Sequence, residues 1–380
     1  MKIFKDVVFT IMVLVLMIGC SRKPAGPVNA YRTSVGSGED EIPLVVVSGT
    51  PYEMGHALGR LMKDEVNQCI TGFLEWAQMA DPGGFSDNIL DQAWDRISPF
   101  THQRIKDELQ GLADGAGIEY DILRRAHMIP VVAANACSGV VVWGNASNNG
   151  SLYHLRNLDF VMDASLQDFP LVIVYIPDEG QPHFIPTFAG YIGANTGMNA
   201  KGIILGEKGE SPYTEYPFEI DGNHFTFLFR DILYDTKTLE EARRYIENAD
   251  LIKRYYYYLS DGKVESQGAY KFKVESPDSI SLFLWSDNDS QDELYPNVFE
   301  DIIYHTMDNE NAFTYLTNHY GHLDERAMIE LSRQVAMKRE NLMNVIYNGN
   351  TLDMWVTYAH GYKLASTREY VYIKIDNYLD

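Results

Sequence analysis

The 380-residue chain is poor in cysteine and in basic residues. Three cysteines are too few for a disulfide framework in a chain of this size. The 31 Lys and Arg residues face 53 Asp and Glu residues, which gives a formal net charge of −22. A field of that sign repels phosphate, so the composition disfavours a partner made of nucleic acid.

Several sequence signatures of cofactor and metal sites are also missing. No Gly-rich phosphate loop opens a helix, no Cys/His cluster has metal-ligand spacing, and no repeat period is visible. We therefore expect neither a cofactor nor a metal. Hydrophobic residues make up 46% of the chain and charged residues 22%, which is typical of a folded protein with one large domain or two ordinary ones.

The N-terminus has the pattern of an export signal. Lys2 and Lys5 precede an apolar run from Val7 to Ile18, which is too short to span a bilayer as an ordinary helix. A basic start, a short apolar core and a small residue at its end are typical of a secretory signal peptide. We expect residues 1–19 to be this signal.

The end of the run, Leu16 to Cys20, resembles a bacterial lipobox, in which the cysteine after the cut is lipidated. The resemblance implies a protein held in the bacterial cell envelope by a lipid on Cys20, facing the periplasm or the surface. The alternative is a plain signal peptide with a chance cysteine. Residues 20–43 are rich in Ser, Lys, Pro, Gly and acidic residues, which predicts a tether with no folded element.

Residues 44–136 are predicted to form a mostly helical segment. Thr50, Pro51 and Glu53 fit an N-cap, a first helical position and a capping box. Apolar residues then recur at helical spacing as far as Phe73, and further helical stretches are expected at about 87–116 and 120–132. Cys69 falls on the apolar face of the first stretch, which favours a buried, inert thiol.

From Cys137 onwards the chain is rich in strand patterns, interrupted by helical patterns at about 223–248, 297–319 and 324–340. This order predicts an α+β fold with stacked sheets and helices rather than a doubly wound parallel sheet. The strand candidates are 140–143, 171–175, 203–205, 281–285, 345–347, 354–356 and 370–375, with a half-buried strand at Tyr255–Tyr258.

A hairpin is predicted directly after Cys137. Asn149-Gly150 separates two strand-like runs, which is a strong hairpin signal. With the turn near residues 147–150, Cys137 lies across from about residues 158–162. The hairpin therefore brings a thiol close to Arg156 and Asp159.

This arrangement allows two interpretations. Arg156 could favour the thiolate of Cys137, and Asp159 could orient the base that takes the proton. If the chain is cut before Cys137, the new α-amino group, with a reference pKa near 8, can be that base. The alternative is a buried small hydrophobe at a strand start beside a structural Arg156/Asp159 ion pair.

The same stretch resembles the cysteine N-terminal nucleophile hydrolases of the penicillin acyltransferase, choloylglycine hydrolase and acid ceramidase group. The resemblance covers most of the mature chain and is carried by several motifs in order. They are Gly49-Thr50-Pro51-Tyr52-Glu53-Met54-Gly55 with Gly59, Cys137 followed by Arg156-Asn157-Leu158-Asp159-Phe160, Phe188-Ala189-Gly190-Tyr191-Ile192-Gly193, Gly197-Met198-Asn199-Ala200-Lys201-Gly202, and Phe227 to Leu233 with Leu239 to Ala242.

The resemblance implies a four-layer αββα sandwich of two antiparallel sheets and self-cleavage between Ala136 and Cys137. Residues 137–380 would then form the catalytic domain. It further implies that Cys137 is the nucleophile and, through its new amine, the base. Arg156 would assist the thiolate and Asp159 would hold the amine. Such enzymes attack a linear, non-peptide amide of an N-acyl substrate, form a thioester and pass the acyl group to water or an amine.

Further residues are assigned to the site by the same resemblance. Asn288, after the 281–285 strand, is expected to help to form the oxyanion hole, whereas Thr317-Asn318 copies the family letters inside a helical pattern. Asn157 and Glu210 are expected near the substrate. Asn199 is a supporting candidate, although an Asn before a Gly-containing loop is more typical of a turn.

Two other classes of function remain as alternatives. A lipoprotein that only binds ligands would keep this fold without the chemistry, and intact Cys137, Arg156 and Asp159 argue against it. A papain-like protease is disfavoured because a hairpin follows Cys137, whereas papain-type cysteines open a helix. The acyl group, the choice between hydrolysis and transfer, and the oligomeric state stay open.

Overall fold

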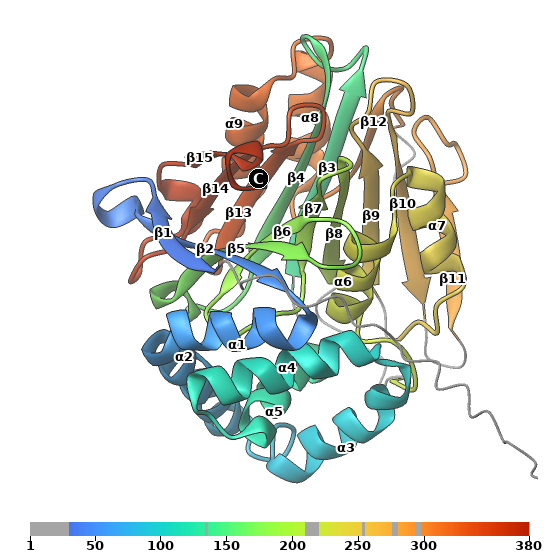
Figure 1. Cartoon of the computed structure of the whole chain (residues 1–380). Coiled ribbons are helices and arrows are strands. Elements are labelled where there is room, and N and C mark those ends of the chain that lie inside the picture. Colours follow the sequence, from blue (N-terminus) through green and yellow to red (C-terminus); the bar gives the residue numbers. More distant parts are fainter. Residues whose placement is uncertain are drawn as a thin grey trace, which may run out of the picture.

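The computed structural model describes residues 30–133, 136–209, 220–252, 255–275, 280–292 and 298–379. Two β-sheets form its centre (Figure 1). The nine-stranded sheet contains, in spatial order, β1 (Tyr31–Val35), β2 (Ile42–Gly49), β5 (Pro170–Pro177), β6 (His183–Phe188), β7 (Thr196–Asn199), β8 (Ile203–Gly209), β9 (Tyr255–Asp261), β10 (Gly268–Glu275) and β11 (Ser281–Trp285). The six-stranded sheet contains β12 (Ile302–His305), β3 (Ala136–Gly144), β4 (Gly150–Asp159), β13 (Met343–Asn348), β14 (Asp353–Tyr358) and β15 (Val371–Lys374).

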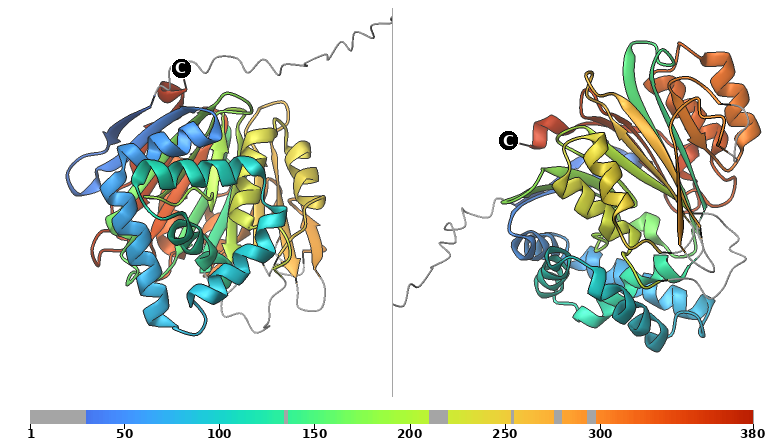
Figure 2. Two further views of the ribbon diagram at one scale, coloured as in Figure 1. Left: turned by 60° about the horizontal axis from the view of Figure 1, so that its bottom comes forward. Right: turned by 90° about the vertical axis from the view of Figure 1, so that its right-hand side faces the viewer.

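Helices cover the outer faces of the two stacked sheets (Figure 2). The nine-stranded sheet carries α6 (Phe225–Asp235) and α7 (Leu239–Glu247), and the six-stranded sheet carries α8 (Asn309–His319) and α9 (Glu325–Val335). A group of N-terminal helices gathers at one end of the sandwich (Figure 1). It consists of α1 (Pro51–Leu61), α2 (Lys63–Ala80), α3 (Asp87–Ile97), α4 (Gln103–Ala116) and α5 (Tyr120–Val132).

The architecture confirms the predicted α+β class and the order of layers, helix, sheet, sheet and helix. One detail differs, because β2 pairs with β5 in parallel and the nine-stranded sheet is therefore mixed. The remaining strand pairs of both sheets in the described residues are antiparallel. None of the helices in this part of the chain is both long and apolar enough to cross a membrane.

The predicted start of the helical segment is confirmed in detail. The Thr50 side chain accepts the backbone N–H of Glu53, and the Glu53 carboxylate accepts the backbone N–H of Thr50, which completes the capping box of α1. The expected first helix is divided at Met62 into α1 and α2, and the stretch 87–116 is divided by a 3-10 turn that contains Pro99. Proline lacks the N–H that a continuing helix would need.

The tether prediction is wrong for residues 31–43. Tyr31–Val35 forms an edge strand that pairs antiparallel with β2, and a short 3-10 turn connects the two. Most side chains of β1 are exposed, and an edge strand of this kind needs few apolar residues. The signal at residues 1–19 and the lipidation site Cys20 lie outside the described residues.

Two expectations further along the chain also need correction. The predicted helix at 297–319 begins only at Asn309, and its earlier apolar residues form the buried strand β12. Tyr255–Tyr258 does lie in a strand, but all four side chains are buried, because β9 has the second sheet on one face and α6 on the other. The expected helix at 223–248 is two helices, α6 and α7.

The N-terminal helices are joined to the rest of the fold by a buried ion pair. The guanidinium of Arg230 on α6 donates to both carboxylate oxygens of Glu108 on α4, at 3.1 and 2.8 Å. Both side chains are fully buried. Arg230 also donates to the carbonyl of Ile192 at 2.6 Å and lies over the ring of Tyr175, with the guanidinium carbon 3.9 Å from the ring centre.

Removal of one partner of this pair should be costly. We expect Glu108→Gln to lower the free energy of unfolding by about 3–5 kcal/mol, because it leaves the Arg230 charge buried without its anion. Urea unfolding followed by circular dichroism measures the loss. The matched control is Asp221→Asn, which breaks the exposed Arg96–Asp221 pair and should cost no more than about 1 kcal/mol. Equal losses in the two variants would contradict the assignment.

Candidate active site

The β3–β4 hairpin places Cys137 beside Arg156. The register pairs Cys137 with Leu158 and Gly139 with Arg156, so the predicted position of Cys137 across from residues 158–162 is confirmed. Directly paired residues project on the same face of a sheet, as do residues two apart, so Cys137 and Arg156 share a face. The Nη2 atom of Arg156 lies 3.2 Å from the Sγ atom of Cys137.

A carboxylate that the sequence analysis did not single out completes this cluster. Glu207, near the end of β8 in the other sheet, accepts from Arg156 Nη2 at 2.8 Å, and its Oε1 atom is 3.9 Å from Cys137 Sγ. The three side chains are fully buried. A signal was available, since Glu207 directly follows the apolar run Ile203–Leu205 and Gly206, where an acidic side chain is unusual.

The charges around Cys137 act in opposite directions. Burial is the dominant cause that raises the pKa of the Cys137 thiol to about 12, and the carboxylates of Glu207 and Asp159 raise it further. The Arg156 guanidinium and the backbone N–H of Gly209 lower the pKa. The thiol of Cys137 is therefore protonated at neutral pH in this buried cluster. It becomes a reactive thiolate only when a base or solvent is present to take its proton.

Asp159 lies at the end of β4, opposite Ala136 in the hairpin register. Its Oδ1 atom accepts from the backbone N–H of Met337 at 3.2 Å and from Nδ2 of Asn341 at 2.9 Å. Its Oδ2 atom is buried and has no hydrogen-bond partner among the described residues. Burial raises the pKa of Asp159 to about 7, although both hydrogen bonds and the charge of Arg156 lower it. This oxygen can accept a hydrogen bond from a group at the start of β3.

The structure does not bring Asn288 to Cys137. Asn288 is an exposed residue at positive φ in the turn after β11, and its backbone N–H donates to Phe299 at 2.8 Å. β11 is the edge strand, three strands away from the β8 strand that carries Glu207, which corresponds to roughly 14 Å. The oxyanion-hole assignment of Asn288 is therefore wrong, because Ser286-Asp287-Asn288 has turn chemistry.

The late strand that does reach Cys137 is β12. His305, at its end, pairs with Gly139 of β3, and the backbone N–H of Met307 donates to Ser138 Oγ at 3.0 Å. The chain that leaves β12 next to Cys137 thus reads Thr306-Met307. Thr317 and Asn318 lie on the exposed side of α8, as the helical pattern indicates.

Two of the remaining candidates make hydrogen bonds within the fold, and the third lies outside the described residues. Asn157 exchanges hydrogen bonds with Ser332 of α9, at 2.9 Å to its carbonyl and 2.6 Å from its hydroxyl. Asn199 donates to the carbonyls of Leu233 and Thr236 and accepts from two backbone N–H groups of its own turn, which fits the turn interpretation. Glu210 lies outside the described residues.

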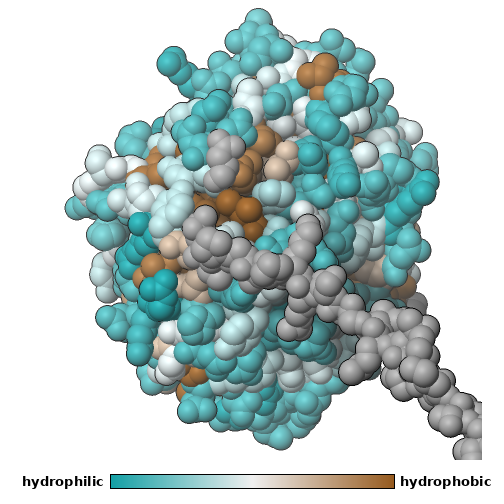
Figure 3. Space-filling model, in the orientation of Figure 1, coloured by the Kyte–Doolittle hydropathy of each residue, from teal (hydrophilic) through white to brown (hydrophobic). Residues whose placement is uncertain are grey.

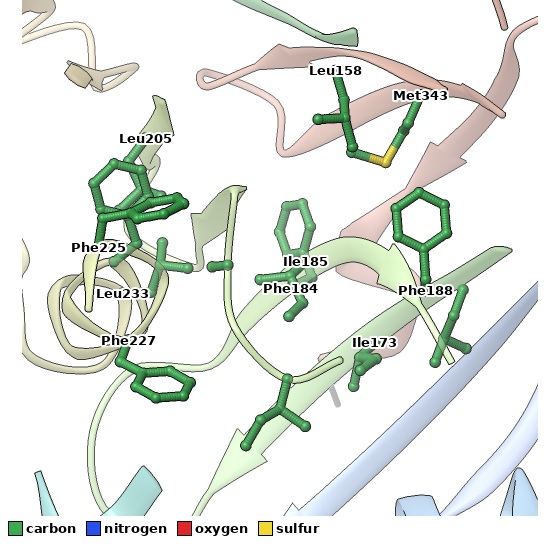
Figure 4. Close-up of a cluster of buried hydrophobic side chains, with 14 of the residues drawn as sticks. Leu158, Ile173, Phe184, Ile185, Phe188, Leu205, Phe225, Phe227, Leu233 and Met343 are labelled. Carbon is green, nitrogen blue, oxygen red and sulfur yellow. The ribbon is translucent and has the colours of Figure 1, made fainter. Parts of the chain in front are cut away.

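An apolar cavity of about 50 Å³ lies next to the cluster. Leu158, the register partner of Cys137, is in its wall, and the carbonyl of Asn195, another wall residue, accepts the backbone N–H of Glu207 at 3.1 Å. Leu158 and Phe188 of this wall belong to the hydrophobic cluster in Figure 4. The full lining is Cys69, Ile70, Phe73, Pro130, Ala133, Leu158, Phe160, Leu166, Phe188, Tyr191 and Asn195.

The cavity therefore lies between the N-terminal helices and the sheets, since α2 and α5 supply Cys69 and Pro130 while β4 and β6 supply Leu158 and Phe188. Cys69 is buried there, as expected, and burial raises its pKa. The face of the molecule in Figure 3 is mostly hydrophilic, with apolar side chains gathered near its centre.

No protein-family model matches the chain. Among curated proteins it is similar to protein dcd1B of Dictyostelium discoideum, with 30% identity over 283 residues, and to protein dcd1A of the same organism, with 28% identity over 328 residues. These matches cover 68% and 72% of this chain and 55% and 73% of the relatives. The match thus spans little more than half of the length of dcd1B.

Three solved structures are similar in part. They are an N-acylethanolamine-hydrolyzing acid amidase ortholog of Caenorhabditis elegans, a penicillin V acylase of Agrobacterium tumefaciens and a variant of the conjugated bile acid hydrolase of Clostridium perfringens. The TM-scores are 0.44, 0.41 and 0.44, and the sequence identities are 16%, 14% and 12%. The matched regions cover 56%, 63% and 63% of this chain and 93%, 86% and 93% of the three solved chains, in the same order.

The opposed charges make a prediction about the pKa of Cys137. We expect Glu207→Gln to lower this pKa, because the variant removes a carboxylate that disfavours the thiolate and keeps the Arg156 cation. Arg156→Gln should raise the pKa of Cys137, because it removes a cation that favours the thiolate. The rate of alkylation by iodoacetamide as a function of pH, with the site of alkylation identified by mass spectrometry, measures both shifts.

In this titration the midpoint for Cys137 should move to lower pH in Glu207→Gln and to higher pH in Arg156→Gln. Alkylation of Cys69, which is unchanged in both variants and is measured in the same digest, serves as the internal control for global unfolding. Midpoints that move in the same direction in both variants would contradict the electrostatic account.

Proposed function

We propose that the protein is a cysteine amidohydrolase that cuts its own chain before Cys137 and then hydrolyses the linear amide of an N-acyl substrate. The observation that carries this proposal is the 3.2 Å contact between the Arg156 guanidinium and the Cys137 thiol inside a buried cluster. The motifs that resemble the N-terminal nucleophile hydrolases support it. A purely structural cysteine gains nothing from a buried cation at its sulfur.

Self-cleavage in this proposal begins at the Ala136–Cys137 peptide. The Cys137 sulfur attacks the carbonyl carbon of Ala136, the C–N bond breaks, and the nitrogen takes up the thiol proton, which leaves a thioester between the two residues. Water then hydrolyses the thioester to the Ala136 carboxylate and a free thiol. The product has a new α-amino group on Cys137.

The new amine supplies the base that the closed cluster lacks. Its reference pKa near 8 suits proton transfer at mild pH. In the proposal Asp159 holds this amine; its position opposite Ala136 in the hairpin and its buried Oδ2 atom, without a hydrogen-bond partner among the described residues, support this role. The amine takes the thiol proton as Cys137 attacks the substrate carbonyl, and it returns the proton to the departing nitrogen. Water, or an acceptor amine in a transferase, then releases the acyl group.

The neighbouring cavity supports a proposal about the acyl group of the substrate. Its wall is mostly apolar and approaches Cys137 through Leu158, so the acyl chain of the substrate would lie there with its carbonyl at the sulfur. An acyl chain of this kind gains about 0.8 kcal/mol for each buried methylene. We therefore propose an aliphatic or aromatic acyl group as the substrate moiety.

Replacement of the nucleophile tests the proposal directly. We expect Cys137→Ala to abolish both self-cleavage and hydrolysis of N-acyl amides, because Cys137 supplies the thiol at the Arg156 guanidinium in the described part of the chain. A denaturing gel and N-terminal sequencing of the fragments detect the cut, and mass spectrometry of trapped acyl-thioester detects turnover. The matched variant Cys69→Ala removes the other buried thiol and should still be cut before residue 137.

Two outcomes would contradict the proposal. Normal turnover in Cys137→Ala would exclude the nucleophile. A wild-type chain that stays uncut and ignores thiol reagents would favour a ligand-binding protein with the same fold.

The acyl cavity can be tested at Cys69, which is in its wall. We expect Cys69→Phe to fill the cavity and to lower kcat/KM for a long-chain N-acyl amide at least about tenfold, corresponding to about 1.4 kcal/mol, with a smaller effect on the N-acetyl analogue. Cys69→Ala should change the ratio of the two kcat/KM values, long-chain amide over N-acetyl analogue, in the opposite direction. A panel of amides that differ in acyl length measures the ratio, and a uniform loss across the panel would contradict the assignment.

A further inference from the structure

Asn341, in the segment between α9 and β13, is hydrogen-bonded through its side chain to Asp159. It is fully buried, and its Nδ2 atom donates to Asp159 Oδ1 at 2.9 Å. The backbone N–H of Met337 donates to the same oxygen at 3.2 Å. Two donors therefore occupy Oδ1, while Oδ2 is buried with no partner in the part of the chain that is described.

The hydrogen-bonding capacity of Asn341 is fully used. Its second amide hydrogen is donated to Asn344 Oδ1 at 2.7 Å, and its own oxygen accepts from Asn344 Nδ2 at 3.0 Å and from the backbone N–H of Ser366 at 2.7 Å. An amide group offers two donors and two acceptor positions, and all four are engaged here. The side chain has no alternative orientation that preserves these contacts.

Asn344 connects this arrangement to the sheet. It pairs with Asn157 of β4, two residues before Asp159, and with Thr357 of β14. The position of Asn341 is thus set by its hydrogen bonds to Asn344 of β13, which lies between β4 and β14, and to the backbone of Ser366.

We propose that Asn341 is a positioning residue, which holds one oxygen of the Asp159 carboxylate so that the other faces the α-amino group of Cys137. The inference rests on the proposed function, because that amine exists only after the cut. Asn341 itself makes no contact with the thiol in the structure. It acts through Asp159.

The charged groups around Asp159 set the direction of the effect. Arg156 of β4 and Lys208 of β8 lower the pKa of Asp159, the hydrogen bonds from Asn341 and Met337 also lower it, and burial opposes all four. The Cys137 thiol of β3 is near enough for its own pKa to be raised by Asp159. Loss of the Asn341 donor must therefore raise the pKa of Asp159 and leave the carboxylate protonated over a wider range of pH.

Two variants separate this role from simple packing. Asn341→Asp is nearly isosteric and preserves the buried volume, but it replaces the donor with a carboxylate beside Asp159. Asn341→Ala removes the whole amide. The control is Ser332→Ala, a buried hydroxyl in the same polar layer that donates to Asn157 at 2.6 Å and has no hydrogen bond to Asp159 in the structure.

Activity is measured with a fluorogenic N-dodecanoyl amide as a function of pH, together with the rate of self-cleavage. In both Asn341 variants we expect kcat to fall at least about tenfold, and the acidic limb of the kcat profile to move up by about one pH unit, with KM changed less than about twofold. Ser332→Ala should lower the melting temperature without moving the acidic limb.

A second measurement does not depend on activity. The carboxyl carbon of Asp159, labelled with ¹³C and assigned by comparison with Asp159→Asn, is titrated by NMR in wild type and in Asn341→Asp. We expect a higher pKa in the variant. An unchanged pKa, or an acidic limb that stays in place in folded Asn341→Asp, would overturn the inference.

The two proposals can fail separately. If the wild type neither cuts itself nor hydrolyses the amide, the proposed function fails. A raised pKa of Asp159 in Asn341→Asp would then show that Asn341 controls a carboxylate without that catalytic use. That result overturns the inference as stated. If the wild type is active and the variants keep the wild-type profile, only the inference fails.

Discussion

The structure depends on a guanidinium that is enclosed between two β-sheets. Arg156 is fully buried, and a cation removed from water is tolerated only where anions and acceptors surround it. Glu207 from the opposite sheet supplies a carboxylate at 2.8 Å and its own backbone carbonyl at 3.4 Å. The pair therefore joins β4 to β8, and the cysteine at the start of β3 shares the same nitrogen of Arg156 with Glu207.

Space for Arg156 comes from the absence of a side chain on the facing strand. A Cβ atom on Gly206 would lie 3.3 Å from Cγ of Arg156 and 3.3 Å from Nε2 of His154. Contacts of that length are tighter than ordinary packing, so even alanine would crowd both side chains. The buried charge of Arg156 thus requires a residue as small as glycine at position 206, which the packing of the two sheets brings opposite Arg156.

The sequence predicted the part of this site that lies on one hairpin. Strand alternation and an Asn-Gly turn are sufficient to bring Cys137 and Arg156 together, because the two residues are 19 positions apart and their register follows from the turn. The capping box at Thr50 was predictable for the same reason, since all of its contacts span three residues. Most of the strands were found by their apolar runs.

Contacts across long stretches of chain could not be predicted in this way. Glu207 is 51 residues from Arg156, and Asn341 is 182 residues from Asp159, so neither spacing carries a periodic signal. The pattern of residues 297–319 predicts a helix where β12 lies, because the four buried residues of β12 show no period that separates a strand from a helix. The edge strand β1 was missed because its side chains are mostly exposed, so it lacks the apolar pattern used to find strands.

The parallel pairing of β2 with β5 has a thermodynamic consequence for a chain cut before Cys137. β2 would belong to one fragment and β5 to the other, so a single sheet would be shared by two polypeptides. Folding of the uncut chain is an event within one molecule, whereas reassembly of the cut protein from unfolded fragments requires two molecules to meet. Stability would then depend on protein concentration, and at the low concentrations of a cell unfolding would be hard to reverse. A cut made after folding would thus leave the lifetime of the protein governed by the rate at which it unfolds.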